Sequence, residues 1–170
     1  MAASNRLIRT IGRAIADALS PRRTVRTSSA GPAPAAAGYP GDFHGTTTLR
    51  YDPRPDNTAD PGEVVWTWVP YEEDNSQGKD RPVLVIGHEG PWLLALPMTS
   101  KDHDRDAAQE AGEGRYWVDI GSGGWDRQRR DSEVRVNRIL RIDPERIRRI
   151  SERISPERFE EVAEGVRRHW

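Results

Sequence analysis

The side chains best suited to holding a phosphate group are those of Arg81 and of the two consecutive hydroxyl residues Thr99 and Ser100. An arginine can make two parallel hydrogen bonds to phosphate oxygens, and it stays charged at any working pH. Threonine and serine hydroxyls can donate further hydrogen bonds to the same phosphate. Such a set stabilises the negative charge that grows on a reacting phosphate, and it requires no metal ion.

A predicted hairpin brings these residues to one place. Residues 81–87 and 91–98 are two apolar runs that flank a turn at residues 88–90. In an antiparallel hairpin about this turn, the numbers of paired residues sum to about 178–180. This register sets Arg81 opposite residues 97–99, within roughly 5 Å if they pair directly. We therefore expect Arg81 and Thr99 at the same end of the hairpin.

Each candidate also has a simpler role. Arg81 can pair with Asp80 or Glu73, and Thr99 can cap a turn because an acid follows it three residues later. His103 lies in an acidic loop, where it can serve as a general base, as a cation ligand, or only as part of a charged surface. Several tryptophans can stack on unpaired bases or can belong to the core: Trp66, Trp68, Trp117 and Trp125.

The charge is unevenly spread along the 170 residues. The net charge is −1, but residues 1–60 carry +3, residues 61–125 carry −7 and residues 126–170 carry +3. The whole-chain field therefore does not steer the protein to nucleic acid, and a local arginine-lined surface has to do so. The arginines of 127–153 can follow a phosphate backbone, or they can form a solvated face with the acids between them.

The composition predicts one soluble domain with polar extensions, and we expect it in the cytoplasm. The chain has no cysteine, which excludes disulfide scaffolds and thiol catalysis. Residues 1–26 form an amphipathic segment, in which residues 5–19 suit a weak contact with a membrane surface, a partner-docking helix, a transit peptide or a disordered tail. Residues 27–60 are rich in Pro, Gly and Ala and read as a linker, and residues 61–170 form the domain.

The domain is predicted to be mainly β. Asp143-Pro144 and Ser155-Pro156 each combine a capping residue with a proline at the first helical position, so each is expected to start a helix. In the second helix Phe159, Val162, Ala163 and Val166 form one apolar stripe. Charged loops are expected at 99–114 and 121–130. Strands are expected at 63–69, 81–87, 91–98 and 115–120, with at least one more within 132–142.

Three stretches of the chain resemble the MazF/PemK family of toxin endoribonucleases. The run GEVVWTWVPYEEDNSQGKDRPVLVIG is similar to the opening of that family, with a strand containing Trp, a Ser-Gln-Gly loop and an Arg-Pro strand. LPMTSKD is similar to a strand ending in Thr or Ser, and SEVRVNRILRIDPERI to the later strands that lead into a helix. The resemblance covers about residues 61–167.

The resemblance implies a fold, an activity and a set of partners. It implies an α+β, mainly β fold, an SH3-like barrel with short C-terminal helices. The N-terminal extension has no counterpart in the short family members, and we expect it to be disordered or partly helical. It implies a homodimer that cleaves single-stranded RNA without metal or other cofactor and is neutralised by a cognate antitoxin. Arg81 would stabilise the transition state and Thr99 would position the phosphate. The expected substrate-binding residues are Ser100, Ser76, Gln77, Lys79 and Trp66.

The chain also departs from the family pattern. The loop before Arg81 carries acids at positions 72–74 and 80, which repel a phosphate chain unless they fold away or pair. Ser76 stands where many relatives have a carboxylate that can accept a proton, so the general base is unassigned. Two alternatives follow: a weak or inactive barrel that acts as an adaptor or regulator tethered through its N-terminal helix, and a metal-dependent nuclease that uses the cluster at 102–106.

Overall fold

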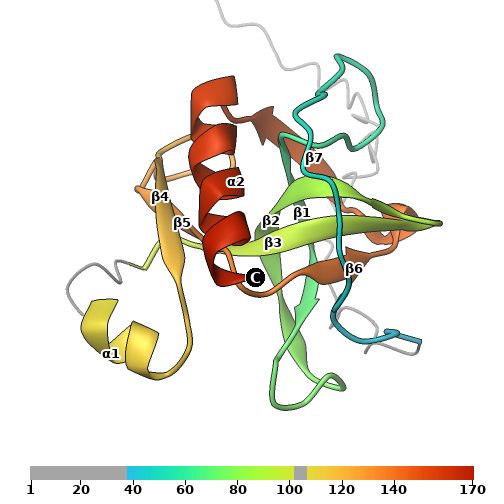
Figure 1. Ribbon diagram of the computed structural model, residues 1–170. Helices are drawn as coiled ribbons and strands as arrows, with labels where there is room; N and C mark the ends of the chain where they lie inside the picture. The colour runs from blue at the N-terminus through green and yellow to red at the C-terminus, as the bar shows by residue number, and fades with distance from the viewer. Residues whose placement is uncertain (1–37, 102–106) are drawn as a thin grey trace, which may run out of the picture. The chain divides into compact units, whose positions relative to one another are not determined.

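The computed structural model describes residues 38–101 and 107–170, which belong to one compact unit (Figure 1). In chain order its elements are β1 (Glu63–Pro70), β2 (Gly78–Glu89), β3 (Trp92–Thr99), α1 (Ala107–Gly112), β4 (Trp117–Gly121), β5 (Ser132–Arg135), β6 (Leu140–Ile142), the 3-10 turn η2 (Pro144–Arg146), β7 (Arg149–Arg153) and α2 (Pro156–His169). Within these residues the strands form one antiparallel sheet in the order β4-β5-β3-β2-β1-β7, and β6 pairs with β3. The fold is α+β, mainly β and barrel-like, as predicted.

The β2–β3 hairpin has the predicted register. Val83 pairs with Pro97 and Val85 with Ala95, so paired residue numbers sum to 180 in this part of the ladder. A bulge between Val85 and Gly87 shifts the register before the turn. β2 begins at Gly78, earlier than expected, because β1 pairs with it along its whole length as far as Pro70.

Alternating side chains of the hairpin enter two different cores. The first, which we call the helix-side core, lies under α2 and includes Leu84, Ile86, Leu94, Leu96, Met98, Val134, Phe159, Val162 and Val166. The second, which we call the strand core, includes Val65, Val69, Val83, Val85, Leu93, Ala95, Leu140 and Ile142. Successive residues of a strand point to opposite faces of the sheet. If one residue enters a given core, the residues two positions away therefore lie on the same face, and its immediate neighbours lie on the other.

The C-terminal helix forms where the sequence predicts it. Ser155 caps α2 by accepting a hydrogen bond from the amide of Arg158 at 3.2 Å, and Pro156 occupies the first turn. The predicted apolar stripe is buried. Gly165 permits a close approach, since a Cβ there would lie 2.9 Å from the side chain of Val118. Figure 1 shows α2 lying beside β4 and β5.

Two predicted elements were wrong in detail. The helix expected after Asp143 stops after the single turn η2, and the chain continues as β7, which pairs with β1. Ile147 and Ile150 pack against the strand core, so tertiary burial outweighs the local helix signal there. The loop expected at 99–114 contains α1, whereas the stretch 132–142, where at least one strand is expected, forms β5 and β6.

The chain before β1 contributes to the core. Phe43 is only 5% exposed, and its amide donates to the carbonyl of Ile139 at 2.8 Å. The Tyr51 hydroxyl donates to the carbonyl of Ile154 at 2.7 Å, and the Tyr51 ring packs on Phe159. Part of the predicted linker at 27–60 therefore supplies core side chains, while the domain limits themselves stay a prediction.

The amphipathic segment predicted within residues 1–26 lies outside the described residues. Its membrane contact through 5–19 therefore stays a prediction. Among the residues that the structure does describe, no helix is long and apolar enough to cross a bilayer.

Phe43→Ala should lower the free energy of unfolding by about 3 kcal/mol, because the substitution empties a buried site. Thr46→Ala, at an exposed position three residues along, is the matched control and should change little. Urea unfolding followed by tryptophan fluorescence measures both. Equal stability of the two variants would show that the segment before β1 does not support the core.

Candidate functional site

Arg81 lies near the start of β2 with its side chain half-buried. It pairs with Thr67 of β1, and it has the same alternation as Val83 and Val85, which enter the strand core. Its guanidinium therefore lies on the strand-core face, beyond the last buried valine of that strand. Within residues 38–101 and 107–170, Arg81 has no ion pair and no side-chain hydrogen bond.

Thr99 lies where β3 changes partners. The β2–β3 ladder ends at Val83 and Pro97, after which Met98 pairs with Val134 and Thr99 with Glu133 of β5. Continuing the β2–β3 register by two residues sets Arg81 opposite Thr99. Both residues have odd numbers in strands that are regular at this point, so they share one face of the sheet. The catalytic roles of the two residues stay predictions.

The Thr99 hydroxyl is oriented by its own turn. Its oxygen accepts a hydrogen bond from the amide of Lys101 at 3.1 Å. A hydroxyl that accepts one hydrogen bond keeps its own proton for donation. Ser100 is half-buried beside it. Thr99 thus has the turn contact expected of a cap and still offers a donor on the face that it shares with Arg81.

Three of the four acids before Arg81, at positions 72, 74 and 80, are bound by other residues. Glu72 accepts two hydrogen bonds from Arg135, at 2.6 and 3.1 Å, and these bonds hold the pKa of Glu72 below its usual range. Asp80 forms an ion pair with Arg148 of the segment before β7; burial nevertheless raises the pKa of Asp80. These contacts pair two of the carboxylates with arginines other than Arg81.

A third acid closes the loop on itself. Asp74 accepts hydrogen bonds from the Ser76 hydroxyl at 2.6 Å and from the Gln77 side-chain amide at 2.8 Å. Hydrogen bonds from Ser76 and Gln77 lower the pKa of Asp74. The two predicted substrate-binding residues therefore serve first to shape the β1–β2 loop.

The remaining two predicted substrate-binding residues lie on opposite faces. Lys79 shares the alternation of Arg81 and lies over the Tyr71 ring, 5.8 Å from its centroid. Trp66 pairs with Pro82 and so faces the other side, where its indole NH donates to the carbonyl of Trp125 at 3.0 Å. The structure brings Lys79, but not Trp66, to the face of Arg81.

Two buried charged residues of β5 were missed by the sequence analysis. Glu133, which pairs with Thr99, is only 6% exposed. Arg135 lies two residues further along β5, on the same face, and is 8% exposed. The signal was present in SEVR, where charged residues alternate with an apolar one, but a charged residue in a strand ordinarily indicates a solvated face. Glu72 of the β1–β2 loop, far away in the sequence, binds Arg135.

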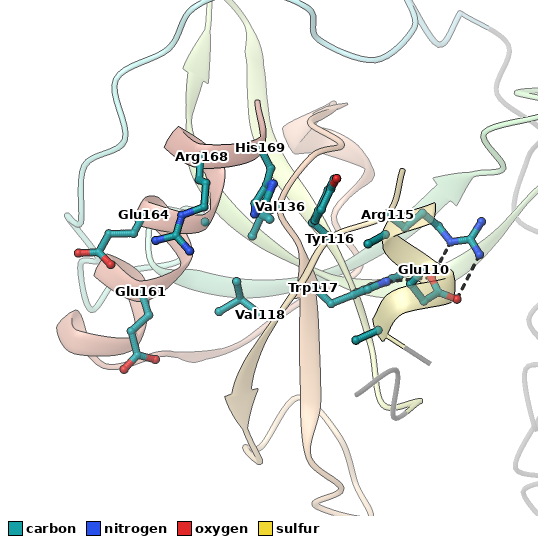
Figure 2. A pocket seen from close by; sticks show the side chains of 13 residues that line it. Glu110, Arg115, Tyr116, Trp117, Val118, Val136, Glu161, Glu164, Arg168 and His169 are labelled. Atoms are coloured by element: carbon teal, nitrogen blue, oxygen red, sulfur yellow. Dashed lines mark hydrogen bonds and ion pairs between the residues drawn. The ribbon is translucent and has the colours of Figure 1, made fainter. Parts of the chain in front are cut away.

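A cavity of about 400 Å³ lies between α1, β4 and α2 (Figure 2). Tyr116 stacks on His169 with ring centroids 3.8 Å apart. On the other side, Glu110 accepts from Arg115 at 2.6 Å and from the Trp117 indole at 3.1 Å. These contacts attach α1 to β4 at the wall of the cavity.

A second, larger hollow of about 850 Å³ lies between the segment 54–59 and β7. Neither of these two cavities is lined by Arg81 or Thr99. The candidate site is therefore a sheet face at the end of the hairpin rather than an enclosed pocket.

The metal alternative cannot be placed on the described residues. His103 and the rest of the cluster at 102–106 lie outside them. Across the described ranges, His, Asp and Glu side chains form no group of three or more suited to a metal ion.

Comparison with known proteins gives one result. Residues 60–170 match the family described as PemK-like, MazF-like toxin of type II toxin-antitoxin system. The matched range contains every strand and both helices of the described structure, together with Arg81, Thr99 and Glu133. Comparison with curated proteins gives no match.

Glu72→Gln should cost about 1 kcal/mol of stability at pH 7, a modest value because the Glu72 side chain is 51% exposed. Arg135 holds the pKa of folded Glu72 below the unfolded value of about 4.3, so the stabilisation is present above that pH and is lost as the pH falls further. Urea unfolding at neutral and acidic pH should show the difference from wild type shrinking in acid. A difference that is constant with pH, or one matched by the exposed Glu73→Gln, would contradict the pairing.

Proposed function

The chain belongs to the PemK-like, MazF-like toxin family of type II toxin-antitoxin systems, and from this premise we propose that it is an endoribonuclease. It is a toxin with an antitoxin partner. In the proposed reaction it cuts single-stranded RNA by means of the RNA's own 2′-hydroxyl, without a metal ion. The products are a cyclic phosphate and a free 5′-hydroxyl.

The observation that carries this proposal is the common face of Arg81 and Thr99. Arg81 has no competing ion pair in the described part of the chain, so its guanidinium can take a phosphate. Thr99 keeps a donor after accepting the Lys101 amide. In the proposed roles Arg81 stabilises the charge that develops on the phosphate, and Thr99 holds the phosphate in line for attack.

The other proposed RNA contacts follow from their positions. Lys79 lies on the face of Arg81, two residues away along β2, and adds positive charge to the path of the RNA backbone. Ser100 adjoins Thr99, and Ser76 and Gln77 lie in the β1–β2 loop that precedes Lys79. Trp66 would have to act on the opposite face, so it is the least favoured member of the set.

We also propose how the protein assembles. The active form is a homodimer in the cytoplasm, and the cognate antitoxin neutralises it by covering the RNA-binding face. The adaptor alternative rested on the repulsion of RNA by the acids near Arg81. Since Glu72, Asp74 and Asp80 are each bound by other residues, that reason for an inactive barrel is weakened.

Arg81→Ala should reduce RNA cleavage by about 100-fold to 1,000-fold, the usual effect of removing one donor to a developing charge. Full-length protein, a single-stranded RNA and EDTA are combined, and the fragments are resolved on a denaturing gel with their end groups identified. Arg50→Ala, at an exposed position before β1, is the matched control and should cleave at the wild-type rate. Thr99→Val should impair cleavage more than Thr99→Ser, which keeps the hydroxyl.

A folded wild-type protein that leaves RNA intact would defeat the proposal and would favour the adaptor. Cleavage that EDTA abolishes would favour the metal-dependent alternative. Arg81→Ala with full activity would remove the proposed mechanism.

A further inference from the structure

We propose that Glu133 is the general base of the reaction and accepts the proton of the attacking 2′-hydroxyl. This inference rests on the proposed function and assigns the one role that the family pattern leaves open in this chain. Arg81 cannot accept a proton because it is already protonated at any working pH. Thr99 is a neutral hydroxyl and serves better as a donor.

The sheet register places the Glu133 carboxylate beside Thr99. The two residues are direct partners across β3 and β5. The preceding pair, Met98 and Val134, is buried in the helix-side core. By alternation Thr99 and Glu133 therefore point together to the other face, with Cβ atoms roughly 5 Å apart. Arg81 shares this face through the continued register of β2, so the phosphate contacts and the carboxylate adjoin.

The other nearby carboxylates are less suitable. Glu72 and Asp74 lie in the loop between β1 and β2 rather than in the ladder of β3 and β5, where Thr99 pairs with Glu133. Asp119 of β4 is the partner of Glu133 on its far side, so it lies one strand further from Thr99, and it accepts the amide of Gly121 at 2.6 Å. Glu133 is the carboxylate of this face that adjoins Thr99.

The charged groups around Glu133 define its setting. Asp119 faces it from β4, Arg135 follows it on the same face of β5, and Arg81 lies beyond Thr99 on β2. Glu72 reaches this face through its bonds to Arg135. Glu133 is 6% exposed, whereas Thr99 next to it is half-buried and so partly open to solvent.

The proposed step balances without a cofactor. The 2′-oxygen forms a bond to phosphorus, and its proton passes to the Glu133 carboxylate. The bond from phosphorus to the 5′-oxygen breaks with its electron pair, and the leaving oxygen takes a proton from water. Glu133 then returns its proton to solvent. Arg81 and Thr99 hold the phosphate oxygens during the exchange.

The test is the pH profile of RNA cleavage by Glu133→Gln. Glutamine keeps the size and one acceptor but takes no proton, so kcat/KM should fall by about 100-fold to 10,000-fold. The variant should also lose the acidic limb of the profile, which a merely structural role would not remove. Asp119→Asn and Glu72→Gln are matched controls on the same face, and both should keep that limb.

The outcomes separate this inference from the proposed function. Wild-type cleavage with an unchanged profile in Glu133→Gln overturns the inference and leaves the nuclease intact, as does loss of the limb only in Asp119→Asn. If Glu133→Gln fails to fold by circular dichroism, Glu133→Asp decides: a slower enzyme that keeps the acidic limb supports a proton acceptor here, and an unchanged rate overturns it. Folded wild-type protein that does not cleave RNA sinks both proposals.

Discussion

The strand β3 pairs with three other strands, and this constraint arranges the candidate site. Its first part pairs with β2 and β6, whereas Met98 and Thr99 pair with β5. Leu96 and Met98 are buried under α2, so the strand cannot slip by one residue without turning its core side chains outward. Burial of Met98 thereby compels Thr99 to point to the other face. The face on which the hydroxyl lies is therefore a consequence of core packing, and the Lys101 amide then orients the hydroxyl on that face.

Three arginines, spaced three residues apart, connect this sheet to segments that the core alone does not hold. Arg135 binds Glu72, Arg138 binds Asp42 at 2.8 Å and the carbonyl of Pro70 at 3.0 Å, and Arg141 binds Glu89. Arg135 and Arg138 are buried, and a buried charge requires a partner. The β1–β2 loop is thus held at both its start and its middle. Removing one partner would leave a buried charge uncompensated, so these pairs specify one position for the loop.

The parts of the fold that could be predicted were those set by local pattern. The β2–β3 register followed from alternation and a short turn, and α2 followed from Ser155 and its apolar stripe. The burial of Phe43, the strand β7 and the setting of Glu133 depend on segments far apart in the sequence. The sequence at Asp143 predicts a helix, but the chain forms only one 3-10 turn there and then continues as β7, which pairs with β1. Likewise Arg81 and Thr99 could be placed by register, but a carboxylate from a third strand could not.

The unevenly distributed charges of the sequence form ion pairs with one another in the fold. The acidic stretch 61–125 and the arginine-rich stretch 126–170 neutralise each other through Glu72–Arg135, Asp80–Arg148 and Glu89–Arg141. Each of these pairs takes a carboxylate from the strands and loops around the hairpin and gives it an arginine from later in the chain. Arg81 is therefore not paired with the acids that precede it in the sequence, although Asp80 is one residue away and Glu72 nine. An arginine in an acidic segment remains available for a phosphate because other arginines have bound its neighbours.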